Sequence, residues 1–381
     1  MTSYLPAILA ALATALISAA AFAAEPTTRP ATATLRATRT PAAAVVADLA
    51  KQVGASLPTF PPDLLATSTL PPVTADLADV SFWDAAREIA KQTGLEPVQN
   101  PEDPYPRFQW GLGGGTFFKP PHAVAGPLLV VATDVHRSST IDLGRAKHDE
   151  HRDLSVSLVA YAAPGVRLLG VAPEVRLLGA VDDLKQSLLP PDAPAVTPTV
   201  ADGAGGESGA LYMTHLSVAL NCPENRGKRI ASLKGRIAVR LQTASQRVEW
   251  EDAMGAKKDA TRQAGAFPVT LKSLKKADIE YVLSLSARRD KRNVADWSNL
   301  QKSIYNGHMA LYDAKGRLVA ARATENGGEY NGNAIDARLR FVREPGVSDA
   351  DAKEPYKLVW DAPTAAKDVT FDFELMDVPI P

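Results

Sequence analysis

The stretch that decides the fold of the N-terminal region covers residues 73–98 and reads VTADLADVSFWDAAREIAKQTGLEPV. Its first part alternates apolar and polar residues with the period of a half-buried strand. Ser81, with Asp84 three residues later, has the form of a helix capping box. Apolar residues then recur at helical spacing over 82–90, and Gly94 suits the left-handed position that ends a helix. The stretch therefore predicts a strand, a capped helix and a second strand.

A similar unit precedes this stretch. Residues 32–37 alternate as a strand, and Thr40-Pro41 offers an N-cap followed by a proline at the first helical position. A helical stripe over 45–53 ends at Gly54, and residues 56–60 read as a short strand. The chain therefore has the strand–helix–strand pattern twice in succession.

Four groups of residues in the second unit form a recognisable motif: Asp79-Val80, Phe82, Asp84-Ala85 and Thr93-Gly94-Leu95. With the tandem halves, they resemble the short N-terminal (STN) domain shared by secretins and TonB-dependent signal-transducing receptors. The first half departs from the motif, with Val53-Gly54-Ala55 at its end. The resemblance covers residues 32–99 and implies a small protein-docking module of the bacterial envelope. Nothing after residue 100 resembles a pore or a receptor.

The N-terminus carries the pattern of an export signal. Residues 5–24 are nearly all apolar and end in Ala21-Phe22-Ala23, an A-x-A cleavage pattern. We expect residues 1–24 to be a signal peptide and 25–31 a short linker; an uncleaved anchor helix is the alternative, because no Lys or Arg precedes the apolar run. No later run is apolar enough to span a bilayer. Periplasmic or secreted localisation follows.

Composition narrows the choice of partners. A net charge of −1 leaves no basic field for nucleic acid, and no motif implies a cofactor. The single cysteine, Cys222, excludes an intramolecular disulfide, and we expect it to be buried and inert. An envelope protein is the expected partner, while its identity and the oligomeric state stay open.

The rest of the chain reads as β structure. A Pro/Gly/aromatic connector over 100–125 leads to short strands at regular spacing over 126–254, a linker at 255–266 and a second set of strands over 267–381. The spacing predicts a β-sandwich in each set. The predicted fold class is therefore α+β, with an N-terminal βαβ-repeat domain followed by two mostly antiparallel β-sandwich domains.

Two groups of residues are candidate sites. His148, His151 and Asp153 could contribute to a metal site, although their spacing and charged flanks are more typical of a solvated loop. The connector carries aromatic residues at Tyr105, Phe108, Trp110, Phe117 and Phe118, which could form a partner-binding or sugar-stacking surface. Alternatively these rings pack against a neighbouring domain. The glycines of 111–115 lack the Lys-Ser/Thr that a phosphate loop requires.

Three functions remain open from the residues. The first is a non-enzymatic envelope protein that docks a protein partner through the STN-like module. The second is a glycan-binding protein that uses the aromatic loop at 105–118. The third is a metal-dependent hydrolase at His148 and His151. We expect the first, because no catalytic motif is present.

Overall fold

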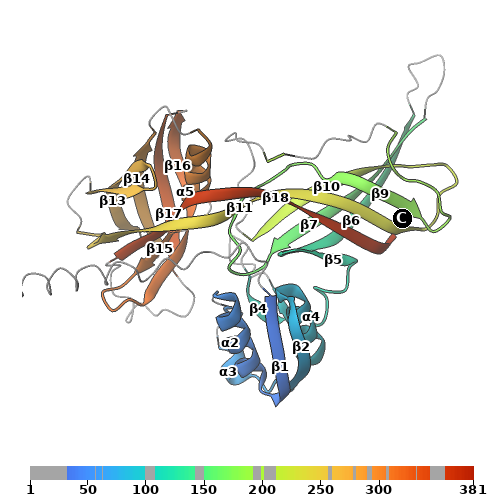
Figure 1. The fold of residues 1–381 in the computed structure, drawn as a ribbon, viewed down its shortest axis with the longest axis horizontal. Helices are drawn as coiled ribbons and strands as arrows, with labels where there is room; N and C mark the ends of the chain where they lie inside the picture. Colours follow the sequence, from blue (N-terminus) through green and yellow to red (C-terminus); the bar gives the residue numbers. More distant parts are fainter. Residues whose placement is uncertain are drawn as a thin grey trace, which may run out of the picture.

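The computed structural model describes most of the chain after residue 31 (Figure 1). The described residues are 32–55, 57–61, 63–98, 108–141, 150–191, 199–200, 212–255, 260–277, 280–289, 294–305, 309–331, 333–343 and 357–381. The structure is α+β and mainly antiparallel β, as predicted. Within these residues, no helix is long and apolar enough to cross a membrane. The expected signal peptide lies outside them.

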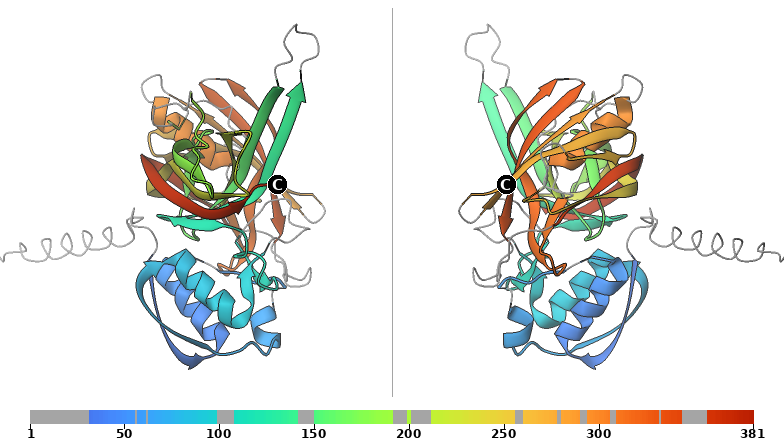
Figure 2. Two further views of the ribbon diagram at one scale, coloured as in Figure 1. Left: turned by 90° about the vertical axis from the view of Figure 1, so that its right-hand side faces the viewer. Right: turned by 90° about the vertical axis from the view of Figure 1, so that its left-hand side faces the viewer.

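The N-terminal part, which we call the αβ unit, comprises residues 32–98. Its elements are β1 (Thr32–Thr40), α2 (Ala42–Val53), α3 (Leu64–Thr67), β2 (Val73–Ser81), α4 (Phe82–Thr93) and β3 (Leu95–Pro97). Strands β1 and β2 pair antiparallel into a two-stranded sheet, and α2 and α4 cover one face of it (Figure 2). The expected strand at 56–60 is reduced to one bridge, between Thr59 and Trp110.

The helix ends follow the local sequence closely. The Ser81 hydroxyl accepts a hydrogen bond from the Asp84 amide, as the capping box predicts. Gly54 and Gly94 both end their helices in the left-handed conformation, with φ of 63° and 73°. The prediction of Thr40 as an N-cap is wrong, because α2 begins at Ala42 and Pro41 itself occupies the cap position without a side-chain bond.

The β region contains two further sheets. A four-stranded sheet has the order β10-β7-β6-β5, and a ten-stranded sheet runs from β12 through β13, β14, β17, β16, β15, β18 and β11 to β8, with β9 also on β11. The strands are β4 (Trp110–Leu112), β5 (His122–Ala125), β6 (Leu128–Ile141), β7 (Glu150–Ala162), β8 (Leu168–Val171), β9 (Arg176–Asp182), β10 (Met213–Asn221), β11 (Arg229–Glu251), β12 (Ala260–Ala264), β13 (Phe267–Ala277), β14 (Glu280–Arg288), β15 (Met309–Tyr312), β16 (Leu318–Asn331), β17 (Ala334–Arg343) and β18 (Lys357–Pro379).

Two strands of 23 residues each, β11 and β18, run the length of the β region. They pair antiparallel from Arg229 opposite Pro379 to Glu251 opposite Lys357 (Figure 1). Each strand contributes to two cores, so the expected division into 126–254 and 267–381 does not separate the two cores. The alternating residues of the C-terminal segment suggest that Trp360 and Phe373 share one core, but β18 carries them into different cores.

One core lies between the four-stranded sheet and the β9–β11–β18 end of the large sheet, and we call it the sandwich core. It includes side chains from both sheets, among them Val156, Leu233 and Leu375. This part matches the predicted β-sandwich arrangement. Cys222 is buried in the same core, as expected.

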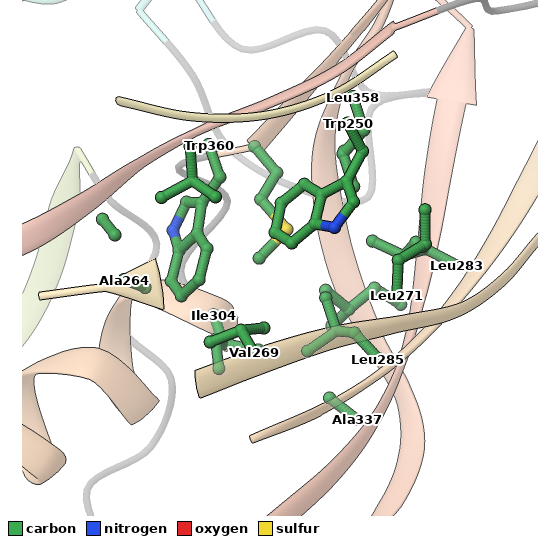
Figure 3. Packing of buried hydrophobic residues seen from close by; sticks show 14 of the residues in the cluster. Trp250, Ala264, Val269, Leu271, Leu283, Leu285, Ile304, Ala337, Leu358 and Trp360 are labelled. Carbon is green, nitrogen blue, oxygen red and sulfur yellow. The ribbon is translucent and has the colours of Figure 1, made fainter. Parts of the chain in front are cut away.

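The second core, the closed-sheet core, lies inside the curled half of the large sheet (Figure 3). Strand β12, which falls in the expected linker 255–266, returns beside β11, where the Trp250 indole donates to the Ala260 carbonyl at 2.9 Å. Helix α5 (Val294–Tyr305), which the sequence analysis missed, closes this core with Trp297, Leu300 and Ile304. One sheet curled on itself therefore replaces the second predicted sandwich.

The αβ unit and the four-stranded sheet share the third core. It combines Trp83 and Ile89 of the αβ unit with Leu129 and Val131 of β6. The apolar positions of 73–98 predict that Leu77, Phe82, Ile89 and Leu95 converge, and all four belong to this core or pack against it. In the connector, β4 pairs with β3 and β5 joins the four-stranded sheet, so its described residues are integral to the fold.

Candidate functional site

The glycine-rich turn of the connector is built around the carboxylate of Glu96. This side chain extends from β3 and its residue is only 1% exposed. It accepts hydrogen bonds from the Thr116 amide at 2.9 Å, the Thr116 hydroxyl at 3.1 Å and the Phe117 amide at 3.0 Å. Three donors on one carboxylate compensate for its removal from water. The donors of this turn are therefore occupied by the protein's own Glu96 side chain.

The glycines make this arrangement sterically possible. A Cβ at Gly113 would overlap the Glu96 carboxyl group, so a side chain at this position would expel it. Gly114 and Gly115 have φ of 70° and 78°, a conformation that favours glycine. The composition of 111–115 is thus explained by close packing and turn geometry.

An aromatic cluster lies beside this turn, at the junction of the αβ unit and the four-stranded sheet. The Trp83 ring is in contact with four others, with centroid distances of 5.2 Å to Phe82, 6.0 Å to Phe108 and 6.4 Å to both Phe117 and Tyr161. The remaining members of the cluster are Trp110, Phe118, His122 and Tyr212. Edge-on, tilted and offset-stacked contacts of this kind stabilise a junction beyond the area that they bury.

A hydrogen bond ties the two sides of the junction together. The Trp83 indole nitrogen donates to the Pro127 carbonyl at 3.1 Å, within the buried interior. Pro127 lies directly before β6, whereas Trp83 is in the first turn of α4. The αβ unit is therefore fixed to the sheet by both apolar packing and a polar contact, and is not a tethered module on a hinge.

Two tyrosines complete the junction, Tyr161 on β7 and Tyr212 directly before β10. Burial raises the pKa of Tyr161. Burial raises the pKa of Tyr212 far more, and the neighbouring Tyr161 raises it further. Both phenols are therefore neutral at any physiological pH, because the interior disfavours the phenolate. They serve as packing groups with a polar end, and neither is poised as a base.

The connector aromatics occupy the interior more than the surface. Trp110 is fully buried at 0% exposure, and Phe117 and Phe118 are half-buried. A ligand cannot stack on Trp110 in this structure, so its expected role in partner binding has no accessible surface to use. Tyr105 lies outside the described residues. Phe108, Trp110, Phe117 and Phe118 instead pack in or against the core shared with the αβ unit, as in the alternative in which these rings pack against a neighbouring domain.

The histidine cluster is only partly described. His148 lies outside the described residues, and His151 is placed only through its backbone, which pairs with Thr140. Asp153 lies on β7 and accepts a hydrogen bond from the Ser138 hydroxyl at 3.3 Å. Across the part of the chain that the structure covers, no three His, Cys, Asp or Glu residues are grouped as metal ligands.

Other buried carboxylates are satisfied by backbone donors. Asp182, 1% exposed, accepts from the amides of Leu184, Gln186 and Gly227 at 2.7–3.0 Å. Asp313 accepts from the amides of Lys315 and Arg317 in the turn before β16. Side chains that already accept this many N–H bonds organise turns and are poorly placed to bind a cation.

The sequence analysis missed Trp83 and Glu96, which organise the junction. Trp83 lies three residues before Ala86 and seven before Ala90, so it widens the apolar stripe of α4, and a second packing partner for this helix could have been inferred from it. Glu96 follows an apolar residue within a very short strand, where a carboxylate on a buried segment signals a local cradle of donors. The glycines at 113–115 were the matching signal.

Comparisons with known proteins add little. No family model matches the chain, and neither does any curated protein. One similar solved structure is titled the crystal structure of the conserved domain protein from Bacillus anthracis. It has 11% sequence identity and a TM-score of 0.19, and the match covers 66% of this chain and 89% of that chain. So low a TM-score carries no argument about fold or function.

Proposed function

We propose that this protein is an exported, non-enzymatic protein of the bacterial envelope that docks a protein partner through its αβ unit, with the β region as scaffold. The observation that carries the proposal is the shared core, which fixes the αβ unit so that it protrudes from the elongated β region (Figure 1). A protruding, rigidly held unit presents its surface in one orientation, which lowers the entropy lost on association.

The surface that we assign to the partner is the open face of the β1–β2 sheet, opposite the helices. Arg36 and Asp76 face each other there across the two strands, with 75% and 89% of their side chains exposed. This assignment replaces the aromatic loop, because Trp110 is buried. The STN resemblance supports the same part of the chain on the strength of its residues alone.

Site-specific photocrosslinking tests this assignment. A photoreactive residue at position 36 or 76 should yield a discrete crosslinked product in intact envelopes of the native organism. The same residue at Arg262, exposed on β12, is the matched control and should yield none. Products from position 262 alone would place the function in the β region.

Export has its own test. N-terminal sequencing of the protein from envelopes should find a chain that begins at Ala24 or Glu25, after the A-x-A pattern. An intact Met1 in the membrane fraction would show that residues 5–24 remain as an anchor.

The other two functions have weaker support. The glycan-binding alternative retains only half-buried rings, Phe117 and Phe118, among the described aromatics. The hydrolase alternative depends on His148, which the structure does not describe. Stoichiometric zinc in elemental analysis of the purified protein would favour the hydrolase. Binding of the protein to cell-wall polymers, if the Phe118→Ala substitution abolished it, would favour the glycan-binding function.

A further inference from the structure

The αβ unit consists of two copies of one strand–helix motif, and equivalent residues are 40 positions apart. Arg39 and Asp79 are equivalent and both have positive φ, 49° and 53°. Gly54 and Gly94 end the two helices in the same left-handed conformation. Positive φ in a residue other than glycine is uncommon, so its occurrence at equivalent positions marks a true internal repeat.

The repeat also extends to side-chain contacts across the sheet. The Asp79 amide donates to the Thr34 hydroxyl at 3.3 Å, and the Arg39 amide donates to the Thr74 hydroxyl at 3.1 Å. Each contact lies where the β1–β2 register shifts. Exchanging the two halves converts one contact into the other, so the unit has approximate two-fold symmetry.

The most informative repeated feature is a glutamine on each helix. The Gln52 amide oxygen accepts from the Thr34 backbone N–H at 2.8 Å, and its nitrogen donates to the Thr34 carbonyl at 2.9 Å. Gln92 makes the same two bonds with Thr74, at 2.8 Å and 3.0 Å. This pair of bonds is what a neighbouring strand would form with the same residue.

Each glutamine is itself held in place by the preceding helical turn. The Gln52 nitrogen also donates to the Asp48 carboxylate at 2.7 Å, and the Gln92 nitrogen donates to Glu88. Asp48 and Glu88 are again equivalent positions. The two hydrogens of each side-chain nitrogen and the amide oxygen therefore all have partners, so the side chain is preorganised for the strand edge.

The glutamines cover the outer edges of β1 and β2, which are the edges open to pairing with another strand. Among the described residues, β1 and β2 form a sheet of only two strands, so each has an outer edge without a neighbouring strand. Such edges pair readily with the edges of other chains. Strand pairing at Thr34 or Thr74 would have to displace a glutamine that already makes both main-chain bonds.

We propose that Gln52 and Gln92 are edge latches, which keep the outer edges of β1 and β2 from pairing with a second copy of this chain. The presence of the same device in both halves argues that it is a required part of the repeat. The inference concerns self-association and does not depend on the proposed envelope function.

Hydrogen exchange measured by NMR on the full chain tests the latch directly. Gln52→Met retains the aliphatic stem and helix propensity but has no amide. It should speed exchange of the Thr34 amide by about tenfold or more, because the amide loses its acceptor, and leave Thr74 unchanged. Gln92→Met should do the reverse. The repeat thus supplies a matched control for each variant.

Sedimentation velocity on the Gln52→Met/Gln92→Met double variant tests the consequence. The double variant should associate at protein concentrations about tenfold or more below those at which the unmodified chain does. Unchanged exchange at Thr34 and Thr74 would overturn the latch, and faster exchange without stronger association would overturn its protective role. If the methionine variants lose helical circular dichroism, Gln52→Lys and Gln92→Lys, which lack the acceptor, take their place.

Discussion

The shared core of the αβ unit and the four-stranded sheet leads to a specific prediction for Trp83. This side chain is 1% exposed, contacts four aromatic rings and donates to the Pro127 carbonyl. Replacing a buried tryptophan with alanine costs about 3–5 kcal/mol of unfolding free energy. We expect Trp83→Ala to fall in this range, because rings from both sides surround the space and limit its collapse.

A second variant separates packing from the hydrogen bond. Trp83→Phe keeps an aromatic ring but leaves the Pro127 carbonyl without its donor, at a cost of about 1–3 kcal/mol. Leu112→Ala serves as the control, since Leu112 is 57% exposed in the same region. It should change the unfolding free energy by less than about 0.5 kcal/mol.

Urea unfolding followed by far-ultraviolet circular dichroism measures these differences. Because the core is shared, the αβ unit and the four-stranded sheet should unfold in one transition, and Trp83→Ala should shift it. An early, separate transition of the αβ unit, or a Trp83→Ala effect below about 1 kcal/mol, would refute the shared core. Deleting residues 32–99 should expose Leu129 and Val131 and cause aggregation.

Three further predictions concern polar groups. Glu96→Ala should cost about 2–4 kcal/mol in urea unfolding, because three donors lose their acceptor, and Gly113→Ala should also destabilise the turn. The Arg240 guanidinium beside Asp368 lowers the pKa of that carboxyl by hydrogen bonding and then by charge, so its contribution is present above about pH 4 and is lost as the pH falls further. Asp368→Asn, half-exposed, should cost about 1 kcal/mol at pH 7 and almost nothing near pH 2 in the same assay. Because burial raises the pKa of Tyr212, stability should fall as the pH rises above about 10, where only the unfolded state ionises, and Tyr212→Phe should reduce this loss in alkaline titrations followed by tyrosinate absorbance.

The features that could be predicted from the sequence depend on neighbouring residues. The Ser81 cap and the Gly94 helix end involve groups within a few positions of each other, so the local pattern determines them. That the chain after residue 126 consists mostly of strands was also predictable, because alternation is a local property. The hairpin at 313–316 formed as its turn residues predict, with Gly316 at φ of 75°.

The features that escaped prediction depend on distant partners. Strand β18 reads as two strands because Pro363 interrupts it, and proline normally ends a strand. In the structure Pro363 lies opposite Ser245, within the irregular register of β11, where an interruption of the ladder is tolerated. The continuity of both strands is therefore a property of the pair, which neither sequence segment shows alone.

The candidate site illustrates the same limit. From its composition alone, a connector rich in proline and glycine would be interpreted as a hinge. The structure uses Gly113 for the opposite purpose, since the absent side chain makes room for the Glu96 carboxylate that ties the connector to β3. A glycine indicates flexibility only where no other group fills the space that it leaves.

Rigidity at three places bears on how a partner could be recognised. Strands β11 and β18 join the two β cores and are linked by cross-strand ion pairs, including Arg240 with Asp368 at 2.6 Å. Trp83 joins the αβ unit to the segment before β6, and Glu96 joins it to the connector. A module on a flexible tether would search for its partner and lose conformational entropy on binding. A unit held in this way has lost that entropy on folding, so under the proposed function recognition would depend on the fixed geometry of the β1–β2 face.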